Sequence, residues 1–230
     1  MTQRSILIVD DEPGIIKSVK AYLQAEGYTV HTASDGASAL KSARTLKPDL
    51  IVLDIMLPQI NGLEVLRQLR QESQVYVILL TAKNEETDKV IGLGIGADDY
   101  MTKPFSPREL VARLQAILRR GRDASTCEAA LVFRHIRIEP ATRRVWKGNN
   151  LVELTPIEYD LLHALARHHG RMLTREQLIE QVWGHDFYGD ARLVDVHIGR
   201  IRKKIEDDPA KPTLLATVRG AGYHFEDAPQ

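Results

Sequence analysis

Five residues that lie far apart in the chain have the side-chain types needed to accept a phosphoryl group. They are three aspartates, a threonine and a lysine: Asp10, Asp11, Asp54, Thr81 and Lys103. Crowded carboxylates repel one another unless a cation joins them, and a site made of oxygen ligands suits Mg²⁺. A carboxylate can act as a nucleophile and form an aspartyl phosphate, while an ammonium group and a hydroxyl can bind the phosphoryl oxygens. These residue types predict a phosphoacceptor site with Asp54 as the nucleophile.

The local sequence places these residues at the ends of predicted strands. Strand patterns cover residues 5–9, 28–33, 50–53, 75–80 and 98–101, and helical patterns cover residues 13–27, 35–46, 63–69, 85–95 and 106–120. Five strands alternating with five helices predict an α/β fold with a parallel sheet covered on both faces. In a sheet of order 2-1-3-4-5 the carboxyl ends of the strands surround one crevice. We therefore expect the five side chains to meet there.

Two simpler interpretations exist for the same residues. A single aspartate after a strand is commonly a turn or helix-cap residue, and Lys103 could form an ordinary ion pair with an aspartate. The ion pair alone would require three acids to be buried against one lysine, which is costly. The combination of residues therefore favours the phosphoacceptor site.

The composition is that of a globular protein with two domains. The chain has 230 residues, of which 43% are hydrophobic and 27% charged, and its formal net charge is zero; any basic surface must therefore be local. Cys127 is the only cysteine, which excludes an intrachain disulfide. No apolar run approaches the about 18 residues of a membrane span, and the N-terminal residues do not form a signal peptide. We expect a cytoplasmic protein that does not bind membranes.

Four motifs surround the predicted site: D-D-E at residues 10–12, L-D-I-M-L-P at 53–58, T-A at 81–82 and A-D-D-Y-M-T-K-P-F at 97–105. Together they resemble the receiver domain of two-component response regulators. The resemblance implies a flavodoxin-like fold and phosphorylation of Asp54 by a sensor histidine kinase. It also implies Mg²⁺ held by Asp11, Asp54 and the Met56 carbonyl, with Asp10 acting mostly through water, and a cis peptide bond before Pro104.

The same resemblance implies that Thr81 and Tyr100 form a switch. Phosphorylation adds up to about two negative charges and new acceptor oxygens. Thr81 can turn toward them, and the Tyr100 ring can then move into the vacated space. The alternative is that Tyr100 is a static aromatic residue on an edge strand.

Charged residues near the end of the first half indicate a dimer surface. One subfamily of these response regulators forms salt bridges across the two-fold axis of its dimer. The resemblance implies such bridges here for three pairs: Lys89 with Glu109, Asp98 with Arg120, and Asp99 with Arg113. Ile91, Leu93 and Ala112 could supply an apolar centre. A two-fold interface must be self-complementary, as mixed charges on one face are. The alternative is a solvated charged face, where each exposed pair contributes little.

The second half has a different pattern. We predict a receiver at residues 1–121, a short linker at 122–129 and a second domain at 130–230. Short alternating segments from Leu131 predict a small antiparallel sheet. Thr155 with Glu158 and Thr174 with Gln177 form the capping boxes of two helices. A third helix at 191–207 and a hairpin at 213–225 complete a predicted winged helix-turn-helix.

The third helix concentrates basic charge. Residues 192–204 hold five basic side chains and one acid, Asp195. Val194, Ile198, Ile201 and Ile205 follow helical spacing and predict the buried stripe. The remaining faces are polar and basic, which predicts DNA binding, although a solvated charged face is the alternative.

The motifs L-T-P-I-E-Y-D-L-L, R-M-L-T-R-E-Q-L, V-D-V-H-I-G-R-I-R-K-K-I and V-R-G-A-G-Y resemble the effector domain of the OmpR/PhoB subfamily. The resemblance implies DNA contacts from these residues: Arg192, Val196, His197, Arg200, Arg202, Lys203 and, from the wing, Arg219. Two residues depart from the usual pattern, Leu193 and Gly199. Both remove possible DNA contacts, and a glycine inside a helix also costs about 1 kcal/mol.

These observations predict a transcriptional regulator that is switched by phosphorylation. Phosphorylation of Asp54 would favour a receiver dimer, which places two effector domains on half-sites of promoter DNA about one helical turn apart. RNA polymerase is a further candidate partner. One rival is an aspartate-nucleophile phosphatase, but Met56 stands where such enzymes carry a general acid. The other rival is a constitutive DNA-binding protein whose receiver does not switch. The chain is thus expected not to be an enzyme.

Overall fold

The computed structural model describes residues 3–82, 92–123, 129–184, 187 and 191–229. It contains two compact units, Met1–Leu118 and Arg119–Gln230, which are described separately. The linker expected at residues 122–129 stays a prediction, because residues 124–128 lie outside the described part. None of the helices in the described ranges is long and apolar enough to span a membrane.

The first unit alternates strands and helices as the sequence predicts. In chain order its elements are β1 (Ser5–Val9), α1 (Pro13–Ala25), β2 (Thr29–Ala33), α2 (Gly36–Leu46), β3 (Leu50–Asp54), α3 (Gly62–Glu72), β4 (Tyr76–Ala82), β5 (Asp99–Lys103) and α5 (Pro107–Asp123). Residues 92–95 are helical; the rest of the helix expected at 85–95 lies outside the described residues. The strands form a five-stranded sheet of order β2-β1-β3-β4-β5, all parallel, which confirms the predicted α/β fold.

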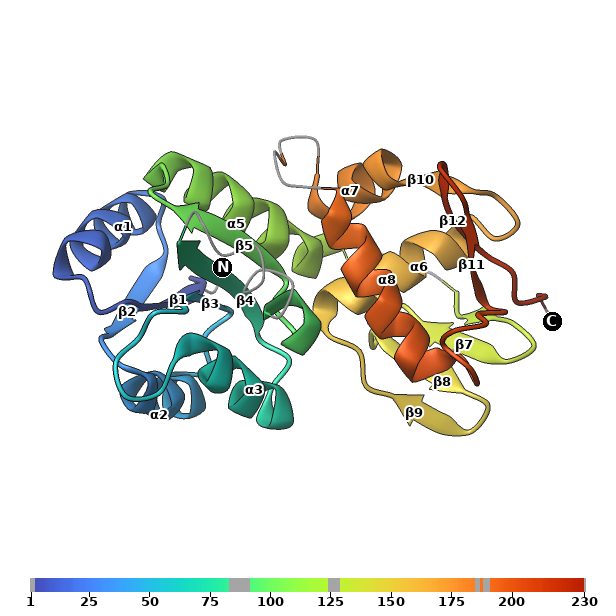
Figure 1. Ribbon diagram of the computed structural model, residues 1–230, viewed down its shortest axis with the longest axis horizontal. Helices are drawn as coiled ribbons and strands as arrows, with labels where there is room; N and C mark the ends of the chain where they lie inside the picture. The colour runs from blue at the N-terminus through green and yellow to red at the C-terminus, as the bar shows by residue number, and fades with distance from the viewer. Residues whose placement is uncertain (1–2, 83–91, 124–128, 185–186, 188–190, 230) are drawn as a thin grey trace. The chain divides into compact units, whose positions relative to one another are not determined.

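The sheet is covered on both sides. Helices α1 and α5 lie on one face and α2 and α3 on the other (Figure 1). The apolar runs of β1, β3 and β4 are fully buried between these layers, which is why they lack the alternation of a half-exposed strand. The register pairs Val9 with Leu53, so the residues that follow both strands leave the sheet side by side.

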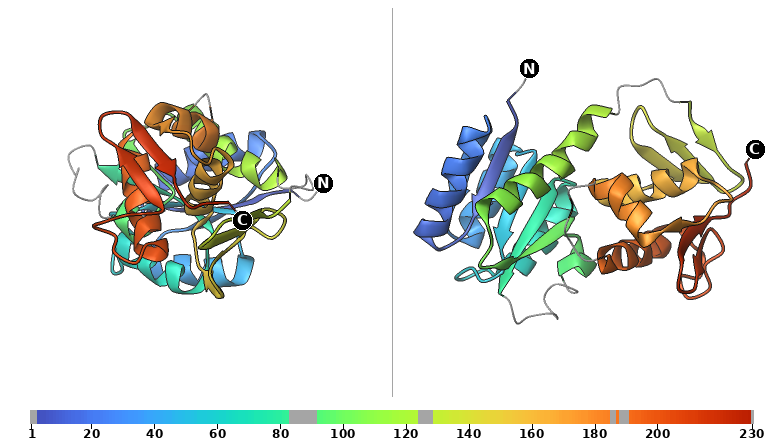
Figure 2. Two further views of the ribbon diagram at one scale, coloured as in Figure 1. Left: turned by 90° about the vertical axis from the view of Figure 1, so that its right-hand side faces the viewer. Right: turned by 90° about the horizontal axis from the view of Figure 1, so that it is seen from above.

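Over its described residues, the second unit contains two antiparallel sheets and three helices after α5. Its elements are β6 (Leu131–Val132), β7 (Ile136–Glu139), β8 (Arg144–Lys147), β9 (Asn150–Val152), α6 (Pro156–Arg167), β10 (Leu173–Thr174), α7 (Arg175–Trp183), α8 (Arg192–Ile205), β11 (Leu215–Val218) and β12 (Gly222–Phe225). The sheet orders are β6-β7-β8-β9 and β10-β12-β11. Helix α8 runs beside α6 toward the β11–β12 hairpin (Figures 1 and 2). This α+β arrangement is a winged helix-turn-helix, as predicted.

The helix-capping motifs predicted from the sequence are present in the second unit. Both capping boxes are present, at Thr155 with Glu158 and at Thr174 with Gln177. They satisfy backbone N–H groups that have no partner within the helix. Gly184 caps the carboxyl end of α7, and its φ of 93° is in the region that favours glycine. The stripe of Val194, Ile198 and Ile201 is fully buried, which leaves the other faces of α8 for polar contacts.

Candidate functional site

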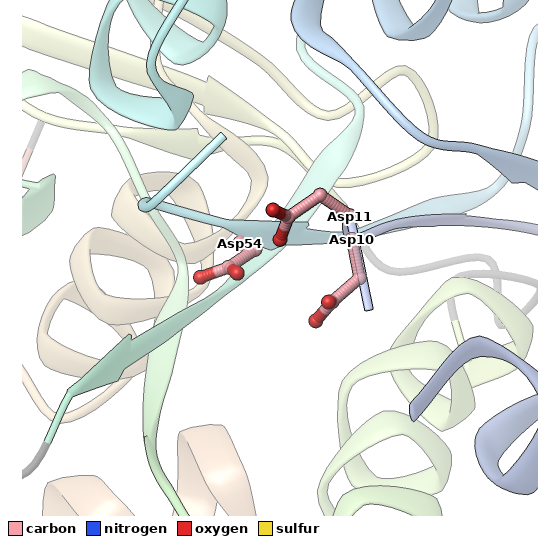
Figure 3. Close-up of side chains that lie close together, drawn as sticks. All are labelled: Asp10, Asp11 and Asp54. Atoms are coloured by element: carbon pink, nitrogen blue, oxygen red, sulfur yellow. The ribbon is translucent and has the colours of Figure 1, made fainter. Parts of the chain in front are cut away.

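Three carboxylates gather at the carboxyl ends of β1 and β3. Carboxylate oxygens of Asp10, Asp11 and Asp54 lie within 4.8 Å of one another, and Figure 3 shows the three side chains at these strand ends. Asp10 and Asp54 are 0% and 2% exposed, while Asp11 is exposed. The parallel register explains this convergence, because Asp10 directly after β1 and Asp54 at the end of β3 reach the same edge of the sheet.

Lys103 from the end of β5 neutralises part of this charge. Its Nζ lies 2.7 Å from Asp54 Oδ2 and 2.9 Å from Asp10 Oδ2. Burial raises the pKa of Asp10, although the hydrogen bond from Lys103 opposes this shift. Burial also opposes the charged form of Lys103, but hydrogen bonds to Asp54 and Asp10 outweigh it and raise the lysine pKa. Lys103 therefore stays protonated and positioned beside Asp54.

Lys103 has one partner that the sequence analysis did not select. Glu12 Oε1 lies 3.2 Å from Lys103 Nζ, and the Glu12 side chain is 61% exposed. The backbone N–H of Glu12 also donates to Asp10 Oδ1 at 2.9 Å. The sequence signal that could have identified Glu12 is its place in the D-D-E motif at residues 10–12.

Thr81 and Tyr100 occupy neighbouring strands near the acids. Thr81 lies in β4 and is fully buried; its hydroxyl donates to the carbonyl oxygen of Ala82 at 3.3 Å. Tyr100 lies in β5 and is partly exposed. The Lys103–Pro104 peptide bond is cis, as expected.

The loop after β3 closes tightly over Asp54. The Gly62 N–H donates to the Ile55 carbonyl oxygen at 2.9 Å, and a Cβ atom at Gly62 would lie 2.0 Å from the Asp54 carbonyl oxygen. Only glycine allows this approach. The Met56 N–H donates to Asp54 Oδ1 at 3.2 Å, and the Met56 side chain is largely exposed.

The residues expected at the dimer surface divide into three groups. Lys89 and Ile91 lie outside the described residues, and nothing is described for the Arg120 side chain. Leu93 and Asp98 are 3% and 0% exposed in the single chain, so their place on a dimer surface stays a prediction that requires them to become accessible. Asp98 binds Arg70 of α3 at 2.9 Å.

The third group makes bonds within the chain. Arg113 binds both Asp99 at 3.0 Å and Glu109 at 2.9 Å. Asp99 is fully buried and Arg113 is nearly so, while Ala112 is partly exposed. A dimer that uses the Asp99–Arg113 pair across two chains would first have to break this internal one.

Helix α8 has an exposed face with a basic residue at each end. Arg192 and Lys203 are exposed, and Val196 and Gly199 between them are partly exposed. Their spacing of four, three and four residues aligns them along the helix. A Cβ atom at Gly199 would meet nothing within 4 Å.

Other basic residues of α8 have partners inside the domain. Arg200 and Lys204 bind Glu158, the fully buried capping residue of α6, at 2.7 Å each. Arg202 donates to the Leu215 carbonyl oxygen and to Thr217 Oγ1 on β11, each at 2.6 Å from Nη2. These side chains fasten α8 to its neighbours on both flanks of the exposed face.

The DNA contact expected of His197 stays a prediction, and it would require this side chain to leave the interior of the domain. The His197 side chain is fully buried, and its ring lies 5.8 Å from that of Trp183. Leu193 is also buried, at 1% exposure, so its departure from the usual residue changes the core and not the DNA surface. Helical spacing could identify both positions, since they flank the buried stripe.

The acidic cluster suits a divalent cation. The three carboxylates carry more negative charge than Lys103 can balance, and two of them are buried. Oxygen ligands from one exposed and two buried groups match a hard cation that keeps some of its waters.

Comparisons with known proteins agree with the fold and the site. Residues 6–115 match the response regulator receiver domain family, and residues 148–225 match the family of transcriptional regulatory protein C-terminal domains. The chain is 50% identical over 233 residues to the alkaline phosphatase synthesis transcriptional regulatory protein PhoP of Bacillus subtilis (strain 168), covering 97% of each.

Solved structures give the same result. The chain is similar to DrrB, a Thermotoga maritima OmpR/PhoB homologue, with 34% identity and a TM-score of 0.53, covering 98% of this chain and all of that one. A RitR mutant matches with 29% identity, a TM-score of 0.79 and the same coverage. PhoP is named as a transcriptional regulatory protein and DrrB as a response regulator. The chain therefore belongs to the OmpR/PhoB-type response regulators, the two-component transcription factors that join a receiver to a winged helix-turn-helix domain.

Proposed function

We propose that Asp54 accepts a phosphoryl group from a sensor histidine kinase in the presence of Mg²⁺. An Asp54 carboxylate oxygen attacks phosphorus, the P–N bond to the kinase histidine breaks, and the released imidazole keeps the electron pair and takes a proton. The observation that carries this proposal is the convergence of three carboxylates with Lys103 at one edge of the sheet.

Several residues would then respond to the new charge. The Lys103 ammonium group, now bound to Asp54, pairs with a phosphoryl oxygen, and the Thr81 hydroxyl turns from Ala82 to donate to another. The Tyr100 ring then moves inward. This repacking couples the site to the β5–α5 surface.

Asp10, Asp11, Asp54 and the Met56 carbonyl would hold Mg²⁺. The bound cation supplies positive charge that stabilises the transferred phosphoryl group. Asp11 is exposed and provides an accessible ligand, while the buried Asp10 orients the site through its bond from the Glu12 N–H.

The phosphorylated receiver would dimerise and place two effector domains on promoter DNA. The surface we propose consists of charged and apolar residues of the receiver: Lys89, Ile91, Leu93, Asp98, Asp99, Glu109, Ala112, Arg113 and Arg120. RNA polymerase stays a predicted partner.

The exposed face of α8 would enter the major groove. This face consists of Arg192, Val196, Gly199 and Lys203, while Arg219 of the wing would reach a phosphate or the minor groove. Arg200 and Arg202 would serve mainly as internal anchors, since each already has a partner.

The first test measures the molar mass of the chain in solution with Mg²⁺, with and without beryllofluoride. The proposal is supported if beryllofluoride shifts the wild type from monomer to dimer and Asp54→Ala abolishes this shift. The surface variant Asp208→Asn is the control and should still show the shift. DNA affinity measured in the same samples should rise with the shift. An unchanged DNA affinity with visibly modified Asp54 would favour a constitutive DNA-binding protein.

A further inference from the structure

The β11–β12 hairpin is fastened to one face of helix α8 by two side chains. Asp195 and Arg202 stand seven residues apart, which is about two helical turns, so they share a face. This face is separate from the buried stripe of Val194, Ile198 and Ile201. The hairpin therefore has contacts with α8 that the hydrophobic core does not require.

Asp195 holds the inner strand of the hairpin. The Tyr223 hydroxyl of β12 donates to Asp195 Oδ1 at 2.6 Å, and Arg175 Nε of α7 donates to the same oxygen at 2.7 Å. The Arg175 guanidinium carbon also lies 5.2 Å from the centre of the Tyr223 ring. Tyr223 is 5% exposed. A hydrogen bond from a buried hydroxyl to a carboxylate is stronger than one between neutral groups.

Arg202 holds the outer strand. Its Nε and Nη2 atoms donate to the Leu215 carbonyl oxygen at 3.0 and 2.6 Å, and Nη2 donates to Thr217 Oγ1 at 2.6 Å. Its guanidinium carbon lies 5.6 Å from the Tyr223 ring centre. Asp195 and Arg202 together thus contact both strands of the wing.

These contacts determine where the tip of the wing lies. Strand β11 ends at Val218, which pairs with Gly222, and the exposed Arg219 lies in the turn between them. Directly after this turn, a Cβ atom at Gly222 would lie 2.0 Å from the Leu173 carbonyl oxygen, so the tip end of β12 is closely packed on β10. The backbone on both sides of Arg219 is therefore held, because β11 and β12 are both fastened to α8.

An acid on a helix that binds DNA needs an explanation, because a carboxylate near phosphates weakens binding. Asp195 is the only acid among residues 192–204, and its charge is balanced by Arg175. Its bond to Tyr223 gives it a role that no basic residue could fill.

We propose that Asp195, Tyr223 and Arg202 form a clasp that positions the wing, and with it Arg219, beside the DNA-facing side of α8. This inference rests on the proposed function, which places Arg219 against DNA. The three are positioning residues: they act on DNA through Arg219.

The test is a double-mutant cycle on DNA affinity. The variants are Tyr223→Phe, Arg219→Ala and both together, with Tyr159→Phe in α6 as a matched control. The probe is a duplex selected from a randomised pool by the beryllofluoride-treated wild-type chain, titrated at several salt concentrations.

If the clasp positions Arg219, the effects are not additive. Each single variant should weaken binding about tenfold, and the double variant should also weaken it about tenfold rather than about a hundredfold. Each variant should reduce the slope of log K against log salt concentration by about 1, the value expected for the loss of one phosphate contact. Tyr159→Phe should change neither quantity. A purely structural role for Tyr223 would not change the salt dependence of the folded protein.

Amide hydrogen exchange without DNA separates the clasp from the proposed function. Exchange in residues 215–223 should be faster in Tyr223→Phe than in the wild type, and Thr217→Ala, at an exposed position, repeats the test if Tyr223→Phe does not fold. Faster exchange supports the clasp even if the wild-type chain selects no duplex from the pool, which would overturn only the proposed function. Unchanged exchange, additive losses, or wild-type affinity in Tyr223→Phe or Arg219→Ala would overturn the inference.

Discussion

At Gly62 the absence of a side chain allows the loop after β3 to pack directly on the backbone of Asp54. An added Cβ would lie 2.0 Å from the Asp54 carbonyl oxygen, and backbone atoms cannot move away as a flexible side chain can. We therefore expect Gly62→Ala to lower the free energy of unfolding of the receiver by about 1–3 kcal/mol. It should also slow the phosphorylation of Asp54 by a small-molecule phosphodonor, because the carboxylate is displaced.

Gly94→Ala is the matched control for this variant. Gly94 is helical and exposed, and a Cβ there would meet nothing within 4 Å. Urea unfolding should show that Gly94→Ala is neutral or stabilising. Equal stability and equal phosphorylation rates for the two variants would contradict the steric argument.

The Tyr223 hydroxyl links the stability of the effector domain to alkaline pH. Burial, together with the hydrogen bond to Asp195, raises the pKa of Tyr223 from 10.0 to about 12. The fold therefore favours the protonated hydroxyl, and the stability gained is complete below the unfolded-state pKa of about 10. It is lost as the pH rises toward about 12. Urea midpoints should fall over this window more steeply in the wild type than in Tyr223→Phe, and parallel curves would count against the assignment.

At the scale of elements, the junction of α6 and α8 depends on Glu158. This buried residue caps α6 and also binds Arg200 and Lys204 of α8. Glutamine can replace glutamate in a capping box, so Glu158→Gln keeps the cap and removes the charge.

We expect Glu158→Gln to lower the free energy of unfolding of the effector domain by about 2–4 kcal/mol, because the ion pair with Arg200, which is 11% exposed, is lost. The measurement is urea unfolding beside Glu176→Gln, an exposed residue in the first turn of α7. If both variants lose the same small amount of unfolding free energy, the ion pairs of Glu158 do not hold α8 in place.

For the whole molecule, the two compact units should unfold separately. Each has its own buried core, and the proposed Mg²⁺ site lies in the receiver alone. Calorimetry should give two transitions, and Mg²⁺ should shift only that of the receiver. At a Mg²⁺ concentration one hundred times the Kd, the free energy of unfolding of the receiver should rise by about 2.7 kcal/mol.

Asp11→Ala should abolish this shift without disturbing the core, because Asp11 is exposed. A single cooperative transition, or a Mg²⁺ shift in both transitions, would mean that the units are coupled in stability. A shift that survives Asp11→Ala would remove this residue from the proposed metal site.

Much of the molecule follows from the sequence alone. The apolar runs that become β1, β3 and β4 are continuous because both of their faces are buried, and their spacing between helical patterns determines a parallel sheet. Once the strands are parallel, the acids at the carboxyl ends of β1 and β3 must share one edge, so the order of the residues is enough to group Asp10, Asp11 and Asp54. The capping boxes at Thr155 and Thr174 are likewise local, because they require only residues three positions apart.

The tertiary structure decided which charged and polar groups are exposed. Helical periodicity separates the faces of α8, but it does not say which element packs on each face. Only the packed domain shows that Arg200 binds Glu158, that Arg202 binds β11 and that His197 is buried. The burial of Leu93 and the Asp98–Arg70 pair in the receiver are of the same kind. Partners brought together from distant parts of the chain leave no local pattern, and for that reason they become visible only in the folded molecule.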